Sequence, residues 1–202
     1  MKTCKINLYS FNELSDAAKS KAIEDYRKGN DYSFMYDEAH ETVKKFNDVF
    51  NLNEGRNSWL DYSDNFEDNV LILTGQRLRT YILNNFGNSL YKGKYYSLWS
   101  KTEKSYKYYK DGYPVLKSKH SKILLENCCV LTGVCYDDDI LQPIYNFIDK
   151  PDTSNLTDLI NDCFYSLKNS LEREEDCRNT DDYISEEIEA NEMQFTEDGK
   201  KY

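Results

Sequence analysis

Apolar side chains between residues 33 and 50 recur at the spacing of an α-helix. They follow one another at intervals of four, four, three and four residues, and they are Met35, Ala39, Val43, Phe46 and Phe50. Charged residues fill many of the intervening positions, so a helix here has one apolar and one polar face. A helix of about five turns with such a face must bury it. We expect its partner to be the chain's own sheet or the helix that precedes it.

Shorter elements are predicted on both sides of this helix. Ser15 stands where an N-cap belongs, and the helix-forming stretch that follows it ends at Gly29. Further along, residues 58–62 and 70–74 are typical of strands, and residues 76–86 are typical of a helix.

Prolines and capping residues divide the chain toward its C-terminus. We expect Pro143 and Pro151 to bracket a short helix, and Thr153 or Ser154 to cap a longer one that extends to Leu167. The acidic sequence beyond it predicts a marginal surface helix or a tail, because it holds few apolar anchors. Those anchors are Tyr183, Ile184, Ile188, Met193 and Phe195.

Together these patterns predict an α+β fold. N-terminal amphipathic helices are expected to pack on a small mixed or antiparallel sheet, and an acidic helix or tail is expected to end the chain. A length of 202 residues suits one domain with an appendage. We therefore expect a single globular domain over residues 1–169 and an acidic appendage over residues 170–202.

Ionised side chains are unevenly distributed. The chain has 26 basic and 36 acidic residues, a net charge of −10, and residues 152–202 carry the whole excess. Carboxylates in a row can imitate duplex phosphates, which carry one charge per ~1.7 Å of axis, and can so occupy the basic channel of a nucleic-acid-binding enzyme. A solvated face, or a strap that neutralises the chain's own lysines, is the alternative. The residues expected to form the acidic surface are Glu174, Glu175, Asp176, Asp181, Asp182, Glu186, Glu187 and Glu189.

Lysine and tyrosine are concentrated in residues 91–123. This segment has nine lysines against two acidic residues, and it has seven of the 18 tyrosines. The alternation within residues 91–113 and the Asp111-Gly112 turn predict a β-ribbon there. Ammonium groups beside aromatic rings are typical of single-stranded nucleic-acid grooves, whereas a ribbon packed through its tyrosines needs no ligand. The candidate nucleic-acid-binding residues are Lys101, Lys104, Tyr106, Lys107, Tyr108, Tyr109 and Lys110.

Two further motifs are weaker candidates for ligand binding. Gly75 with Arg77 and Arg79 marks a strand-to-helix turn, and helix N-termini expose unpaired N–H groups that bind anions. The run at residues 137–139, three consecutive aspartates, offers oxygen ligands to a divalent metal but lacks the spacing of an EF-hand loop. We favour a helix-capping role in a solvated loop for this run.

No enzymatic chemistry is expected of the chain. The sequence contains no GxSxG, HExxH, Walker or Rossmann motif, so we expect no catalytic residues and no cofactor. Its two histidines, His40 and His120, lie far from any useful cysteine spacing, so we expect no metal site. The six cysteines form no CxxC pair, and the sequence has neither a signal peptide nor ~18 consecutive apolar residues. We expect reduced thiols, a cytoplasmic location and no membrane partner.

Three stretches resemble small acidic proteins encoded in phage and prophage genomes of gut and Gram-positive bacteria. They are NLYSFNELSDAAKSKAIEDYR (7–27), VLTGVCYDDDILQPIYNFIDKPD (130–152) and ISEEIEANEMQFTEDGKKY (184–202), roughly a third of the chain. The resemblance carries no active site. It implies a mobile-element setting, in which small acidic accessory proteins often inhibit host defence, as anti-CRISPR proteins do.

Charge and resemblance together predict a phage protein that acts by binding. We expect it to inhibit a nucleic-acid-directed defence enzyme of the host, such as a CRISPR effector nuclease, through its acidic C-terminal surface. Three alternatives stay open: a nucleic-acid-binding module in residues 91–123, a sponge for a small nucleotide signal near Gly75, and an antitoxin-like or assembly partner.

Overall fold

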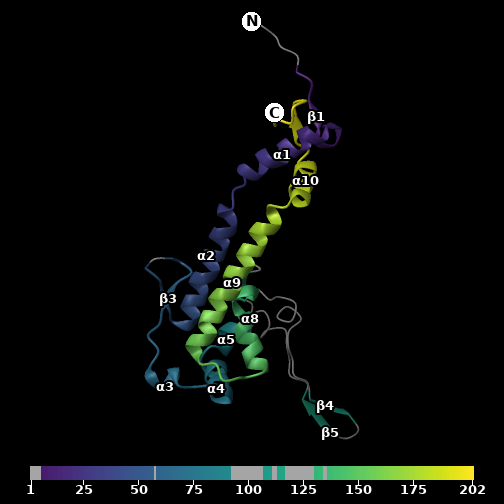
Figure 1. The fold of residues 1–202 in the computed structure, drawn as a ribbon. Coiled ribbons are helices and arrows are strands. Elements are labelled where there is room, and N and C mark those ends of the chain that lie inside the picture. Colours follow the sequence, from purple (N-terminus) through teal and green to yellow (C-terminus); the bar gives the residue numbers. More distant parts are fainter. Residues whose placement is uncertain (1–5, 57, 92–106, 111–112, 117–129, 134–135) are drawn as a thin grey trace. The chain divides into compact units, whose positions relative to one another are not determined.

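The computed structural model in Figure 1 describes residues 6–56, 58–91, 107–110, 113–116, 130–133 and 136–202. The chain forms two units: Met1–Phe34 with Leu171–Tyr202, which we call the terminal unit, and Met35–Ser170, which we call the central unit. The structure thus groups the chain differently from the expected division at residue 169. Residues 171–202 share a unit with the first part of the chain.

The terminal unit joins sequence-distant segments through two strands and two helices. Strand β1 (Tyr9–Ser10) pairs antiparallel with β6 (Gln194–Phe195). The 3-10 helix η1 (Phe11–Glu13) and helix α1 (Asp16–Lys28) follow β1, and α1 packs on α10 (Asp181–Ala190), as Figure 1 shows.

A buried apolar cluster holds the terminal unit together. Ile184 and Ile188 lie one helical turn apart and are fully buried with Ala18 and Ala22 of α1. Three of the five C-terminal anchors, Ile184, Ile188 and Phe195, are therefore core residues, and the expectation of a marginal surface tail is wrong for them. The complete cluster is Phe11, Leu14, Ala18, Ala22, Ile184, Ile188 and Phe195.

Helix α1 begins and ends where the sequence predicts. The Ser15 side chain accepts a hydrogen bond from the N–H of Ala18 at 3.3 Å, and Gly29 is the C-cap residue. Beyond α1, the Gly199 turn lies tightly against the helix, because a Cβ atom at this position would come within 2.9 Å of the Ala18 carbonyl carbon. The C-terminal segment is thus fitted closely to the N-terminal helix.

The central unit contains most of the helices. Its described elements are α2 (Ser33–Phe50, which begins in the terminal unit), β2 (Asn53–Glu54), β3 (Tyr62–Ser63), α3 (Asp68–Leu71), α4 (Gly75–Asn85), α5 (Gly87–Tyr91), β4 (Lys107–Lys110), β5 (Tyr113–Leu116), α8 (Tyr136–Asp149) and most of α9 (Leu156–Arg178).

Helix α2 confirms the predicted apolar stripe. All five stripe residues are buried, and their partners include aromatic residues on other helices. The Phe46 ring meets the edge of Phe164 of α9 at a centroid distance of 5.7 Å, and Phe50 packs on Phe86 at 4.7 Å. Two of the five stripe residues thus pack on α9 and on Phe86, which directly follows α4.

The sheet is smaller than the sequence predicts. Residues 70–74 form no strand: α3 ends at Leu71, Ile72 is exposed, and the N–H of Leu73 bonds to the carbonyl of Val70 at 3.0 Å. This local hydrogen bond satisfies the Leu73 N–H, which in a strand would bond to a neighbouring strand. Of residues 58–62 only Tyr62 lies in a strand, in the two-residue pair β2–β3.

The coarse α+β class is confirmed. Among the described residues, strands occur as three two-stranded antiparallel pairs, β1–β6, β2–β3 and β4–β5. In the last pair, residues 107–110 form a strand as the predicted ribbon requires, and they pair with residues 113–116, Lys107 opposite Leu116. Residues 92–106 of the predicted ribbon lie outside the described residues. Pro143 lies inside α8 and does not begin a helix.

Candidate partner-binding surface

Helix α10 carries a row of carboxylates on the face opposite its buried side. Ile184 and Ile188 are buried, whereas Asp182, Glu186 and Glu189 are exposed. The three acidic residues occupy positions i, i+4 and i+7, which share one helix face. We call Asp182, Glu186 and Glu189 the acidic stripe.

The acidic stripe has no counter-charge of its own. None of its three carboxylates forms an ion pair or a side-chain hydrogen bond with any other residue that the structure describes. Adjacent stripe residues have Cβ atoms about 5–6 Å apart, whereas one duplex strand carries a phosphate per ~3.4 Å of axis. The stripe is a straight row of like charges, less dense than a nucleic-acid strand.

The other five predicted carboxylates are placed differently. Glu174 pairs with Arg178 at 2.6 Å, and Asp181 pairs with Arg27. Glu187 is half-buried on the side of α10. Glu175 and Asp176 lie in the last turns of α9. The structure therefore brings three of the eight onto one exposed face of α10 and uses at least two in ion pairs.

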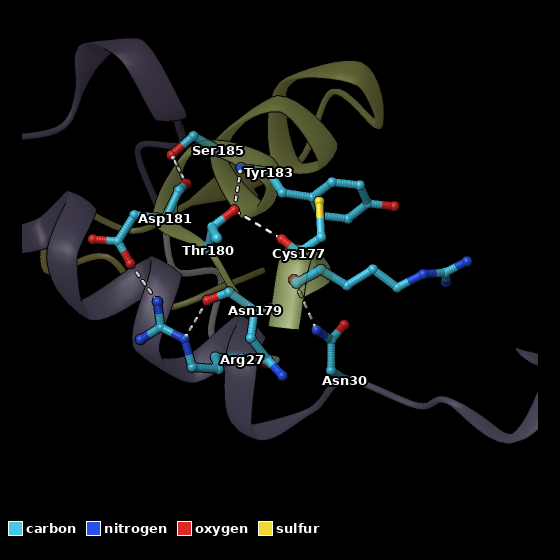
Figure 2. Close-up of polar contacts among 9 residues, drawn as sticks. Arg27, Asn30, Cys177, Asn179, Thr180, Asp181, Tyr183 and Ser185 are labelled. Carbon is cyan, nitrogen blue, oxygen red and sulfur yellow. Dashed lines mark hydrogen bonds and ion pairs between the residues drawn. The ribbon is translucent and has the colours of Figure 1, made fainter. Parts of the chain in front are cut away.

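The junction between α9 and α10 fixes the orientation of the stripe (Figure 2). Arg27 donates from Nε to the Asn179 carbonyl at 3.0 Å, and its Nη2 pairs with Asp181. Thr180 caps α10 by accepting the N–H of Tyr183 at 3.3 Å. A cation from α1 thus satisfies a carbonyl just past α9 and a carboxylate in the first turn of α10.

A cleft of about 470 Å³ lies beside α10 in the terminal unit. Burial raises the pKa of Tyr26 there, as do the charge of Glu187 and the proximity of Tyr183. The Tyr26 hydroxyl therefore keeps its proton at neutral pH. The lining residues are Ala22, Asp25, Tyr26, Gly29, Asn30, Asp31, Tyr32, Arg178, Tyr183, Glu187, Met193, Phe195, Gly199 and Lys201.

Sequence reasoning missed this cleft, although Glu187 was among the predicted site residues. Its walls come from residues 22–32 and 178–201, and no local pattern links segments so far apart. The available clue was the spacing of Ile184 and Ile188, which marks a helix face that needs a partner.

The candidate anion site does not gather its two arginines. Gly75 begins α4 with a positive φ of 52°, so the turn is where the sequence places it. Arg79 donates from Nε to the Ile148 carbonyl at 2.6 Å, whereas Arg77 is exposed. Positions two apart on a helix do not face each other, so the two guanidinium groups leave α4 in different directions.

The lysine and tyrosine candidates lie at or beyond the edge of the described chain. Lys107, Tyr108, Tyr109 and Lys110 form β4. Lys101, Lys104 and Tyr106 lie outside the described residues. Their role in nucleic-acid binding stays a prediction.

Asp137 has a structural role instead of a solvated one. It is fully buried in the first turn of α8, and its Oδ2 accepts the N–H groups of Leu131, Thr132 and Gly133 at 2.8, 2.7 and 3.0 Å. Its Oδ1 accepts the hydroxyls of Thr132 and Thr42 at 2.7 and 3.1 Å. The predicted position at a helix start is confirmed, whereas the predicted solvent exposure is wrong for Asp137.

Acid is expected to weaken the terminal unit through Asp198. Lys21 and Thr196 donate hydrogen bonds to this carboxylate, each at 2.6 Å, and lower its pKa from 3.8 to about 2. A carboxyl with a lower pKa in the folded chain stabilises the fold above about pH 4 and loses that contribution as the pH falls toward 2. The effect is small, because both groups are exposed.

The test compares the urea midpoint of the wild type with that of Asp198→Asn. We expect the difference between them to be larger at pH 6 than at pH 2.5. Glu197→Gln, which changes the adjacent exposed carboxylate, should show no such trend. An Asp198→Asn difference that is equal at both pH values contradicts the assignment.

Comparisons with family models, with curated proteins and with solved structures each return no match for this chain. Within the residues placed by the structure, no helix has both the length and the apolar character to cross a membrane. Across those same residues, no group of three or more His, Cys, Asp or Glu side chains is arranged to hold a metal ion.

Proposed function

We propose that the chain is a phage-encoded, non-enzymatic inhibitor that occupies the basic cleft of a bacterial nucleic-acid-directed defence enzyme, as an anti-CRISPR protein would. The observation that carries this proposal is the acidic stripe. Three exposed carboxylates, with no counter-charge among the residues that the structure describes, share one face of a helix whose other face is buried.

The acidic stripe opposes the stability of its own helix. Like charges at i and i+4 destabilise a helix by about 0.2–0.5 kcal/mol per pair, and Asp182 with Glu186 is such a pair. A basic partner surface would remove this repulsion and gain charge-assisted contacts. The stripe is therefore better suited to association than to folding.

Rigid placement of the stripe favours binding. The α9–α10 junction and the buried cluster hold α10 in the free protein, so little conformational entropy is lost when a partner binds. Opposite charges also speed the encounter of two proteins, with rate gains that fall steeply as salt increases.

The test is inhibition of target-DNA cleavage by a panel of purified, guide-loaded CRISPR effector nucleases. In the stripe variant, Asp182, Glu186 and Glu189 are all replaced by lysine. In the matched control, lysine replaces Asp37, Asp149 and Asp162, which are exposed residues of the central unit. Both variants change the net charge from −10 to −4.

We expect the stripe variant to lose at least about tenfold in inhibitory potency at low salt, while the control stays near the wild type. Equal potency of the stripe variant and the wild type, or a panel with no inhibited member, would contradict the proposal. A labelled single-stranded oligonucleotide should not bind the protein. Binding with a steep salt dependence would favour the nucleic-acid-binding alternative.

A further inference from the structure

The cleft beside α10 combines aromatic rings with carboxylates. Tyr26 and Tyr183 are half-buried in its walls, and Asp25 and Glu187 lie beside them. Its volume of about 470 Å³ falls within the range of pockets that bind small ligands or single side chains. Aromatic faces attract cations, and carboxylates accept hydrogen bonds from them.

Two of these groups come from different helices and lie close together. Glu187 of α10 contributes to the raised pKa of Tyr26 of α1, second only to burial. A protonated tyrosine offers an aromatic face, and the adjacent carboxylate offers a negative charge. This combination suits a planar guanidinium, which stacks on rings and donates from five N–H groups.

The cleft's own cations leave an excess of negative charge. Arg178 also lines the cleft, but its Nε and Nη2 donate to Glu174 at 3.0 and 2.6 Å. Lys201 is the other basic lining residue, and the lining also holds three carboxylates, those of Asp25, Asp31 and Glu187. The N–H of Ser33 lowers the pKa of Asp31, which keeps that carboxylate ionised.

We infer that this cleft binds an arginine side chain of the protein partner. Glu187 lies on the flank of α10, about 100° around the helix from Glu186, so a partner that covers both the acidic stripe and this flank reaches the cleft. The identity of the partner rests on the proposed function, whereas the chemistry of the cleft does not. The cleft adds a shaped, specific contact to the general attraction of the stripe.

The test titrates the full chain with N-acetyl-arginine amide and follows backbone amide shifts by NMR. N-acetyl-citrulline amide is the matched control, because it has nearly the same shape without the charge. We expect saturable shifts at Tyr26, Tyr183 and Glu187, and at least about tenfold weaker binding of the citrulline compound. Equal binding of both compounds, or shifts confined to the acidic stripe, overturns the inference.

A variant pair tests the role of Glu187. Glu187→Gln should weaken binding of the arginine compound by about tenfold, whereas Glu197→Gln, outside the cleft, should leave it unchanged. Circular dichroism verifies that both variants fold. Unchanged affinity in folded Glu187→Gln contradicts the assignment.

Failure of this inference is distinguishable from failure of the proposed function, because the probe requires no nuclease. If the arginine compound binds in the cleft but no nuclease is inhibited, the inhibitor proposal fails and the cleft assignment holds. If a nuclease is inhibited but the compound does not bind, the cleft assignment alone fails.

Discussion

Replacement of Asp137 by alanine is expected to destabilise the central unit by about 4 kcal/mol. The carboxylate is fully buried and accepts five hydrogen bonds, three of them from consecutive backbone N–H groups. Each buried donor left without an acceptor costs about 1–3 kcal/mol of stability. Water that enters the space left by the carboxylate can bond to some of these donors and so reduces the total cost. A domain of this size has only about 5–15 kcal/mol of stability, so the loss is large.

Urea unfolding followed by tryptophan fluorescence measures this loss, because both tryptophans, Trp59 and Trp99, belong to the central unit. Asp137→Asn should cost less than alanine, since it keeps one acceptor oxygen. The control is Asp139→Ala, which removes a partly exposed carboxylate from the same turn and should change stability by less than about 1 kcal/mol. An Asp137→Ala protein as stable as this control would disprove the role of the carboxylate.

Gly199→Ala is expected to destabilise the terminal unit by about 3 kcal/mol. Gly199 has a φ of 83°, which L residues with a Cβ rarely adopt, and the new Cβ would overlap the backbone of Ala18. Backbone atoms of a helix cannot rotate away as a side chain can. The turn must therefore leave α1, and the β1–β6 pairing next to it is weakened.

Gly87→Ala is the matched control, because a Cβ there meets no atom within 4 Å and Gly87 lies in α5. It should be neutral or slightly stabilising, because alanine restricts the unfolded chain. Limited proteolysis should release C-terminal fragments from the Gly199→Ala protein but not from Gly87→Ala. Equal protease resistance would show that the turn tolerates a side chain.

Local patterns predicted the helices well because each pattern lies within the element that it describes. The stripe of α2 and the caps of α1 need only neighbouring residues. Pro143 led to a wrong prediction because it lies inside α8. A proline in a helix interior lowers helix stability by about 3 kcal/mol, and α8 tolerates this loss because many of its residues are buried. For residues 70–74 the sequence wrongly predicts a strand. Without a partner strand, backbone groups of this apolar run form hydrogen bonds within local turns.

The candidate site was only partly predictable for the same reason. Composition located the acidic residues, and helix periodicity identifies Asp182, Glu186 and Glu189 as one face once α10 is assigned. The partner of α10 was not predictable from composition, because α1 lies more than 150 positions earlier in the chain. Only the fold shows that Arg27 pairs with Asp181 while the acidic stripe has no such partner within the described part of the chain.

The pairing of β1 with β6 also determines when the terminal unit can be completed during synthesis. The ribosome makes the central unit before residues 194–195, so that unit can fold while translation continues. The terminal unit must wait for its last strand, and its first segment remains incomplete until then. A chain released before its last strand is made would therefore lack the β1–β6 pair and the burial of Phe195 that complete the terminal unit.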